Sequence, residues 1–144
     1  MAKVISIINN KGGVGKTTST AFFGEILSLF GKRVLLVDTD ESGNLSLLFN
    51  QFSTDSKNVL AGIEDADRKN ISDIYKYHYR TKEDVEQCIY NIRPNLDIIP
   101  ASGRLSSIPD TLLLQSRTAT TNINIILKKA LRTIEEDYDY IFID

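Results

Sequence analysis

Mostly apolar runs recur along the chain and predict buried parallel strands. They lie at 3–8, 33–38, 96–99 and 140–144, and the first consists mainly of β-branched residues. Strands covered on both faces are apolar throughout, whereas strands with one wet face alternate. We therefore expect an α/β fold with a mostly parallel twisted sheet, in which 3–8 is a central strand buried on both faces.

Two segments show helical periodicity and predict helices that cover this sheet. The first extends from Thr17 to Phe30 and is followed by Gly31, a residue suited to a left-handed helix stop. Its expected apolar face comprises Ala21, Phe22, Ile26, Leu27 and Phe30. The second extends from 121 to 136, with an apolar stripe of Ile123, Ile126, Leu127, Ala130, Leu131 and Ile134. Lys128, Lys129 and Arg132 lie mostly off the stripe, which favours a solvated face over DNA contact.

The middle of the chain is less regular. Residues 51–58 are polar and predict a loop, 70–74 predict a short capped helix, and 105–114 are helix-like with a break near Pro109. Short strands are expected at 88–92 and 96–100, around a Pro-Asn turn. Tyr75, Tyr77 and Tyr79 alternate with basic residues. This pattern fits a patch for single-stranded nucleic acid, but a solvated helix end or hairpin is favoured.

The amino-acid composition limits the classes of function that this protein could have. The chain has 144 residues, 42% hydrophobic and 25% charged, with a net charge of −2. These values are typical of one globular domain and argue against a protein that coats nucleic acid through overall basic charge. A single cysteine, Cys88, excludes an internal disulfide, and the isolated His78 argues against metal ligation. With no signal peptide and no apolar run of about 20 residues, we expect a cytoplasmic protein without membrane contact.

A glycine-rich loop, Lys-Gly-Gly-Val-Gly-Lys-Thr-Thr, joins the first strand to the first helix. Glycines let the backbone approach a polyphosphate, and amides at a helix N-terminus point at its oxygens. We expect Lys16 to contact the β- and γ-phosphates and the Thr17 hydroxyl to bind Mg²⁺. Asn10 stands where the general phosphate-loop pattern has its first glycine. The expected nucleotide-binding residues are Lys11, Gly12, Gly13, Val14, Gly15, Lys16, Thr17 and Thr18.

This loop resembles the deviant Walker A pattern K-G-G-x-G-K-T-T of the ParA/MinD superfamily, and every fixed position is present. The resemblance implies a P-loop three-layer sandwich that forms a dimer upon ATP binding. It also implies that Lys11 reaches across the dimer interface to the phosphates of the other subunit. A cation supplied in trans stabilises the charge that phosphoryl transfer develops, so Lys11 and Lys16 are both candidate catalytic residues.

The stretch from Asp38 to Ser46 resembles the family pattern D-x-D-P-Q-G-N-L, which contains switch I. Glu41 and Ser42 replace its Pro and Gln, a change expected to loosen the switch. The resemblance implies that Asp40 orients or activates the attacking water and that Asp38 lies near Mg²⁺ and its waters. Alone, two aspartates after a strand would suggest only a polar strand end with a helix cap. Their place at the carboxyl edge of a parallel sheet favours a ligand site.

The last run ends at Asp144 and resembles a Walker B strand. The resemblance implies that Asp144 holds Mg²⁺, directly or through water, together with Thr17. Because the sequence stops at this strand, we expect 1–144 to be the N-terminal part of a single ParA-type nucleotide-binding domain truncated there. Weak or absent hydrolysis is expected of these residues alone.

The D-x-D-x-x-G-N-L form looks most like the ParA/Soj branch. This implies a weakly hydrolysing dimeric ATPase with ATP and Mg²⁺, acting in plasmid or chromosome partition. Expected partners are non-specific DNA and a ParB-like centromere-binding protein, with nucleoid association in the ATP-bound state. The alternatives are a MinD-like membrane-cycling ATPase, a P-loop ligase of cofactor biosynthesis, and a nitrogenase-reductase-like electron carrier. The carrier requires cluster cysteines, which Cys88 alone does not supply.

Overall fold

The structure is a computed structural model that describes residues 1–8, 13–52, 68–108 and 123–144. Asn10, Lys11 and Gly12 of the predicted phosphate loop lie outside the described residues. So do most of the loop predicted at 51–58, the part of the 105–114 stretch from Pro109 onwards, and the start of the helix predicted at 121.

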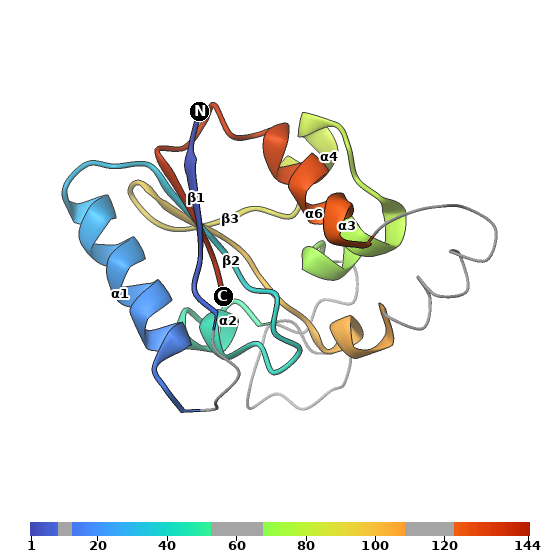
Figure 1. The fold of residues 1–144 in the computed structure, drawn as a ribbon, viewed down its shortest axis with the longest axis horizontal. Helices are drawn as coiled ribbons and strands as arrows, with labels where there is room; N and C mark the ends of the chain where they lie inside the picture. The colour runs from blue at the N-terminus through green and yellow to red at the C-terminus, as the bar shows by residue number, and fades with distance from the viewer. Residues whose placement is uncertain (9–12, 53–67, 109–122) are drawn as a thin grey trace.

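Five strands form one sheet in the order β1-β5-β2-β4-β3 (Figure 1). All neighbouring pairs are parallel except β3 and β4, which form an antiparallel hairpin with Asn95 left-handed in its turn. The mostly parallel sheet predicted from the apolar runs is therefore confirmed. The strands are β1 (Lys3–Ser6), β2 (Val34–Val37), β3 (Tyr90–Arg93), β4 (Leu96–Ile99) and β5 (Tyr140–Ile143).

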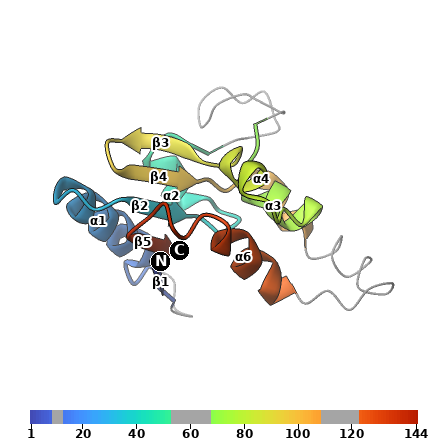
Figure 2. The same cartoon turned by 90° about the horizontal axis from the view of Figure 1, so that it is seen from above.

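Helices cover both faces of the sheet, which gives the predicted three-layer sandwich. Figure 2 shows α1 on one side and α3, α4 and α6 on the other. The short α2 follows β2 and packs against α1, and a 3-10 turn, η1, follows β4. The bounds are α1 (Lys16–Leu29), α2 (Asn44–Leu48), α3 (Ile71–Tyr77), α4 (Lys82–Glu86), η1 (Gly103–Ser107) and α6 (Ile123–Arg132). Within the described ranges, no helix has the length and apolar content needed to cross a bilayer.

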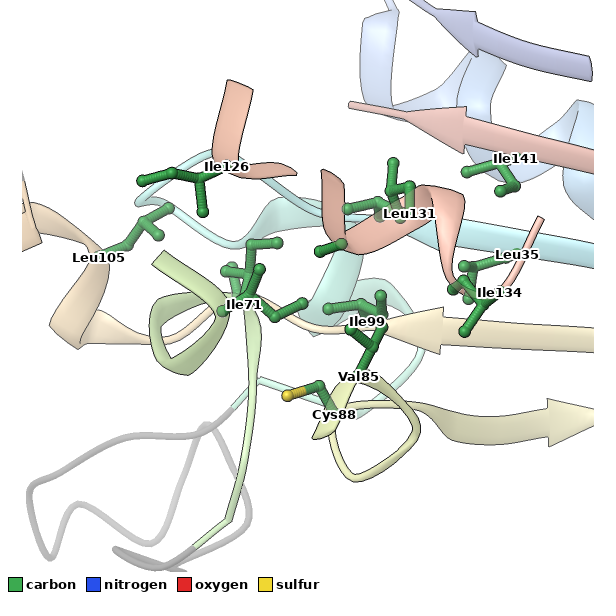
Figure 3. Close-up of a cluster of buried hydrophobic side chains, with 14 of the residues drawn as sticks. Leu35, Ile71, Val85, Cys88, Ile99, Leu105, Ile126, Leu131, Ile134 and Ile141 are labelled. Atoms are coloured by element: carbon green, nitrogen blue, oxygen red, sulfur yellow. The ribbon is translucent and has the colours of Figure 1, made fainter. Parts of the chain in front are cut away.

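Alternate residues of the central strand β2 enter two separate cores. Leu35 and Val37 join the larger cluster under α3, α4 and α6, part of which Figure 3 shows. Val34 and Leu36 face the other way and join a smaller cluster with α1 and α2. All four side chains are fully buried, which explains why the β2 run is apolar at every position.

The predicted apolar face of α1 is partly wrong. Phe22 and Phe30 are 57% and 78% exposed, whereas the helix buries the predicted Ala21 together with Thr20, Gly24 and Ser28. The reason is close packing: a Cβ atom at Gly24 would lie 2.7 Å from Cδ2 of Leu36. Small residues therefore bring α1 close to the sheet, and the aromatic rings are left outside.

The prediction that 3–8 forms a central strand buried on both faces is also wrong for the described residues. β1 is the last strand of the sheet and pairs with β5 alone. Val4 is 51% exposed and Ile5 38% exposed. The physical reason is the strand order, since β5 inserts between β1 and β2 and leaves β1 at the edge of the sheet.

Several local predictions are confirmed. Ile126, Ala130, Leu131 and Ile134 are buried while Lys128, Lys129 and Arg132 are not, although α6 ends at Arg132 rather than at 136. Asn70 caps α3, which ends at Tyr77 before a left-handed His78. The three tyrosines lie at this helix end as predicted, but only Tyr77 is exposed, because Tyr75 and Tyr79 pack against the larger core cluster. Cys88 is a fully buried core residue, and burial raises the pKa of its thiol to about 12.

Candidate functional site

The carboxyl ends of β2 and β5 meet the N-terminus of α1 at one edge of the sheet. Asp38 follows β2, Asp144 follows β5, and Lys16 is the first residue of α1. Gly13 and Gly15 both adopt positive φ, 71° and 85°, which non-glycine residues rarely tolerate. Gly15 is the N-cap of α1 and supplies no side-chain cap. The backbone amides at the start of this 14-residue helix thus directly follow a glycine turn. This arrangement is suited to binding an anion.

The carboxylate of Asp144 lies against two hydroxyl groups of α1. Thr17 Oγ1 donates to Oδ2 at 2.7 Å, and Thr20 Oγ1 donates to Oδ1 at 3.2 Å. Thr17 and Asp144 are 127 positions apart in sequence, so the sheet brings together the two residues predicted to hold Mg²⁺. The same turn contains Val14, which is 45% exposed, and the first residues of the helix include Lys16 and Thr18.

Asp38 is completely buried, and both oxygens of its carboxylate accept hydrogen bonds from the protein. Oδ2 accepts hydrogen bonds from the backbone N–H of Ser46 at 2.8 Å and from its hydroxyl at 2.6 Å. Oδ1 accepts from the backbone N–H of Asp40 at 3.2 Å. Burial raises the pKa of Asp38 to about 6, and the nearby Asp144 adds to the rise while the hydrogen bonds oppose it. Asp38 therefore anchors α2 and the loop before it.

Asp40 is exposed and held by its own loop. Its Oδ1 accepts from the backbone N–H of Ser42 at 2.9 Å and from the Ser42 hydroxyl at 2.8 Å. The Ser42 hydroxyl in turn accepts from Nδ2 of Asn44 at 3.0 Å. The residue expected to loosen the switch thus ties Asp40 to the start of α2.

The oxygen atoms at this edge suit a Mg²⁺ ion that the protein shares with phosphate oxygens and water. The described residues contain no group of three or more His, Cys, Asp or Glu side chains able to hold a metal by themselves. Mg²⁺ is commonly bound through one or two carboxylates with phosphate oxygens and water. A hydroxyl and a carboxylate 2.7 Å apart, beside a phosphate-type loop, match that pattern.

Sequence reasoning missed three hydroxyls that build this site: Thr20, Thr39 and Ser46. Thr39 Oγ1 donates to the backbone carbonyl of Asp144 at 2.6 Å, and Ser46 links Asp38 to the backbone N–H of Ala101. Of these three residues, only Thr20 could have been predicted from the sequence, because it follows Thr17 by three positions and so lies on the same face of the helix.

A glycine turn before α1, with Asp38 and Asp144 at the adjoining strand ends, defines a P-loop type of α/β domain. The AAA_31 family, described as an AAA domain, matches residues 2–144, and the chain belongs to this family. Soj from Bacillus subtilis is 35% identical over 100% of this chain and 49% of its own length. ParA from Caulobacter vibrioides is 33% identical over 99% of the chain and 47% of its own. These relatives place the chain in the ParA/Soj branch of the ParA/MinD superfamily.

Solved structures show the same fold in proteins of two kinds. A plasmid partition protein from Borrelia burgdorferi is 31% identical with a TM-score of 0.74, over 100% of this chain and 56% of that one. Cobyrinic acid a,c-diamide synthase from Mycobacterium smegmatis, with bound ADP and magnesium, is 26% identical with a TM-score of 0.78. That match covers 100% of this chain and 51% of the synthase. The chain thus spans about half the length of the proteins it matches.

Proposed function

We propose that residues 1–144 are the N-terminal part of a ParA-type nucleotide-binding domain that binds ATP with Mg²⁺ and hydrolyses it slowly. The observation that carries the proposal is the Thr17–Asp144 pair, 2.7 Å apart beside a left-handed glycine turn. Identity of 33–35% to Soj and ParA, together with the nucleotide and magnesium in the structure of the synthase, supports the same assignment.

Each residue of the site has a defined role in this proposal. The loop amides and Lys16 hold the β- and γ-phosphates, Thr18 contacts the α-phosphate, and Thr17 with Asp144 holds the cation. Bound Mg²⁺ would neutralise phosphate charge and fix the phosphates' orientation. Asp38 lies close enough to Asp144 for the charge of Asp144 to raise its pKa. In this proposal Asp38 lies near the metal and its waters, where it secures α2.

Hydrolysis in this proposal needs Asp40 and a second subunit. Asp40 is exposed and has one carboxylate oxygen tied to Ser42, so its second oxygen is available to orient the attacking water. Lys11 acts across an ATP-dependent homodimer on the phosphates of the partner. A cation provided in this way makes hydrolysis depend on association.

The biological role we propose is partition of plasmids or chromosomes. It involves non-specific DNA binding by the ATP-bound dimer, a ParB-like partner that stimulates turnover, and a cytoplasmic, nucleoid-associated location. The support is the naming of the relatives as partition proteins, including the Borrelia structure. A second candidate is a ligase of cofactor biosynthesis, favoured by the TM-score of 0.78 to the diamide synthase. Its identity of 26% is lower than the 31% of the partition protein.

DNA co-sedimentation with and without Mg-ATP separates these two functions. We expect ATP-dependent sedimentation that Lys16→Ala abolishes, with Lys32→Ala as a matched control, because Lys32 lies beyond the opposite end of α1. Two results together would favour the ligase instead. DNA binding would be absent or independent of ATP, and phosphate release would require a carboxylic acid to be amidated.

A further inference from the structure

Thr20 lies one helical turn beyond Thr17 and is completely buried. Its single hydroxyl hydrogen faces two acceptors, Oδ1 of Asp144 at 3.2 Å and the backbone carbonyl of Lys16 at 3.1 Å. A buried hydroxyl that contacts a carboxylate does more than fill space, because a hydrogen bond to a charged acceptor is among the stronger polar contacts in proteins.

Hydrogen bonds with Val37 of β2 and with Thr39 already fix the main chain of Asp144. Its N–H donates to the carbonyl of Val37 at 3.0 Å, and its own carbonyl accepts from Thr39 N–H at 3.0 Å and from Thr39 Oγ1 at 2.6 Å. Only the side-chain torsions remain to be set. The terminal torsion of an aspartate has broad, weakly defined minima, so outside contacts must choose the carboxylate plane.

We infer that Thr20 is a positioning residue that orients the Asp144 carboxylate for a divalent cation, an inference that rests on the proposed function. Two hydroxyls from successive turns of α1 hold the two carboxylate oxygens, Thr17 on Oδ2 and Thr20 on Oδ1. Thr20 fixes the oxygen that Thr17 does not contact. The orientation of the carboxylate beside Thr17 is thereby set before the cation arrives.

The competing explanation is purely local. Threonines inside helices often donate back to a carbonyl in the preceding turn, and Thr20 does so to Lys16. Thr133 provides a matched control, because its hydroxyl makes the same kind of bond, to the carbonyl of Ala130 at 2.7 Å, just after α6 and on the other side of the sheet from α1. Comparing the two positions separates the back-bond from the contact with Asp144.

The test is a Mg²⁺ titration of the binding of a fluorescent ATP analogue, with thermal unfolding measured alongside. Groups that orient a metal ligand typically contribute about 10- to 100-fold to metal affinity. We expect Thr20→Val to raise the Mg²⁺ concentration at half-saturation by about tenfold. Thr20→Ser should restore the wild-type value, and Thr133→Val should leave it unchanged. In an Asp144→Asn background, Thr20→Val should add no further loss.

Each other outcome counts against a specific claim. A wild-type Mg²⁺ requirement in Thr20→Val, with or without a lower unfolding temperature, overturns the positioning role and leaves the proposed function intact. If wild-type protein shows no Mg²⁺-dependent nucleotide binding, the proposed function fails and the inference fails with it. If the valine variant does not fold, Thr20→Ala replaces it in the same comparison, because it adds no volume at the buried position.

Discussion

The hydroxyl of Ser42 donates a 2.8 Å hydrogen bond to Oδ1 of Asp40. A residue that departs from the pattern of the ParA/MinD superfamily therefore holds the carboxylate proposed to act on the attacking water. Both residues are exposed, so this contact competes with solvent, and we expect its net contribution to be modest.

For the whole protein, of which residues 1–144 are proposed to be the N-terminal part, we predict that Asp40→Ala retains ATP binding but lowers turnover by about 100-fold or more, because it removes the group that orients the water. Ser42→Ala is the graded control and should change turnover by less than about fivefold, since the backbone N–H of Ser42 still contacts Asp40. Phosphate release at saturating Mg-ATP measures both. Normal hydrolysis by Asp40→Ala would show that another group serves the water.

The buried carboxyl of Asp38 predicts a particular pH dependence of stability. Its pKa is raised from 3.8 to about 6, so the folded protein binds this proton more tightly than the unfolded chain does. The free energy of unfolding should therefore rise, through Asp38, as the pH falls from above 6 toward 4. A shift of about two pH units corresponds to roughly 3 kcal/mol.

Asp38→Asn removes this titration without changing the size of the side chain. Chemical denaturation at several pH values from about 4 to 7, the range that spans the two pKa values, should show wild type gaining stability over the variant as the solution is acidified. A constant difference across this range would mean that Asp38 keeps an ordinary pKa and that the Ser46 hydrogen bonds offset the effect of burial.

Gly43 is required for the turn between Asp40 and α2. Its φ is 60°, and a Cβ atom there would lie 2.1 Å from ring carbons of Phe52. We predict that Gly43→Ala destabilises the protein by at least about 1–2 kcal/mol, from the left-handed backbone alone. Gly103→Ala is the matched control, because Gly103 has no positive φ and a Cβ atom added there would meet nothing within 4 Å. Equal stability of the two variants in urea would contradict this account of the turn.

The proposed trans role of Lys11 predicts a selective loss of dimers. Lys11→Ala should bind Mg-ATP as a monomer yet fail to form the ATP-dependent dimer, because the partner's phosphates lose their cross-interface cation. Size-exclusion chromatography with light scattering, in the presence of ATP, makes this measurement. Lys32→Ala removes a lysine near the far end of α1 and should dimerise normally. Persistent dimers in Lys11→Ala would refute the trans role.

Sequence patterns predicted the sheet well where burial is complete. The runs containing β2, β4 and β5 gave strands within a residue or two of their observed ends, because strands covered on both faces are mostly apolar. The same argument failed for Val4 and Ile5, which have the same β-branched character on an exposed edge strand. Strand order is a long-range property, and a local apolar run contains no information about it.

Side-chain partners at the site were only partly accessible from sequence. The pairing of Thr17 with Asp144 followed from the resemblance to a known pattern, which already encodes the fold. The two hydrogen bonds that Ser46 donates to Asp38 depend on how the loop after β2 turns back into α2. Likewise, the exposure of Phe22 follows from the close contact of Gly24 with Leu36. Such contacts are set by three-dimensional packing rather than by spacing along the chain.

The central claim is that the glycine turn, Lys16, Thr17 and Asp144 form a site for ATP and Mg²⁺. Isothermal titration of ATP into the wild-type protein, with and without Mg²⁺, tests it most directly, with Lys16→Ala and Lys32→Ala measured in parallel. The account predicts binding that Mg²⁺ strengthens, that Lys32→Ala retains and that Lys16→Ala abolishes. Absence of binding in wild type, or equal binding by Lys16→Ala, would contradict it.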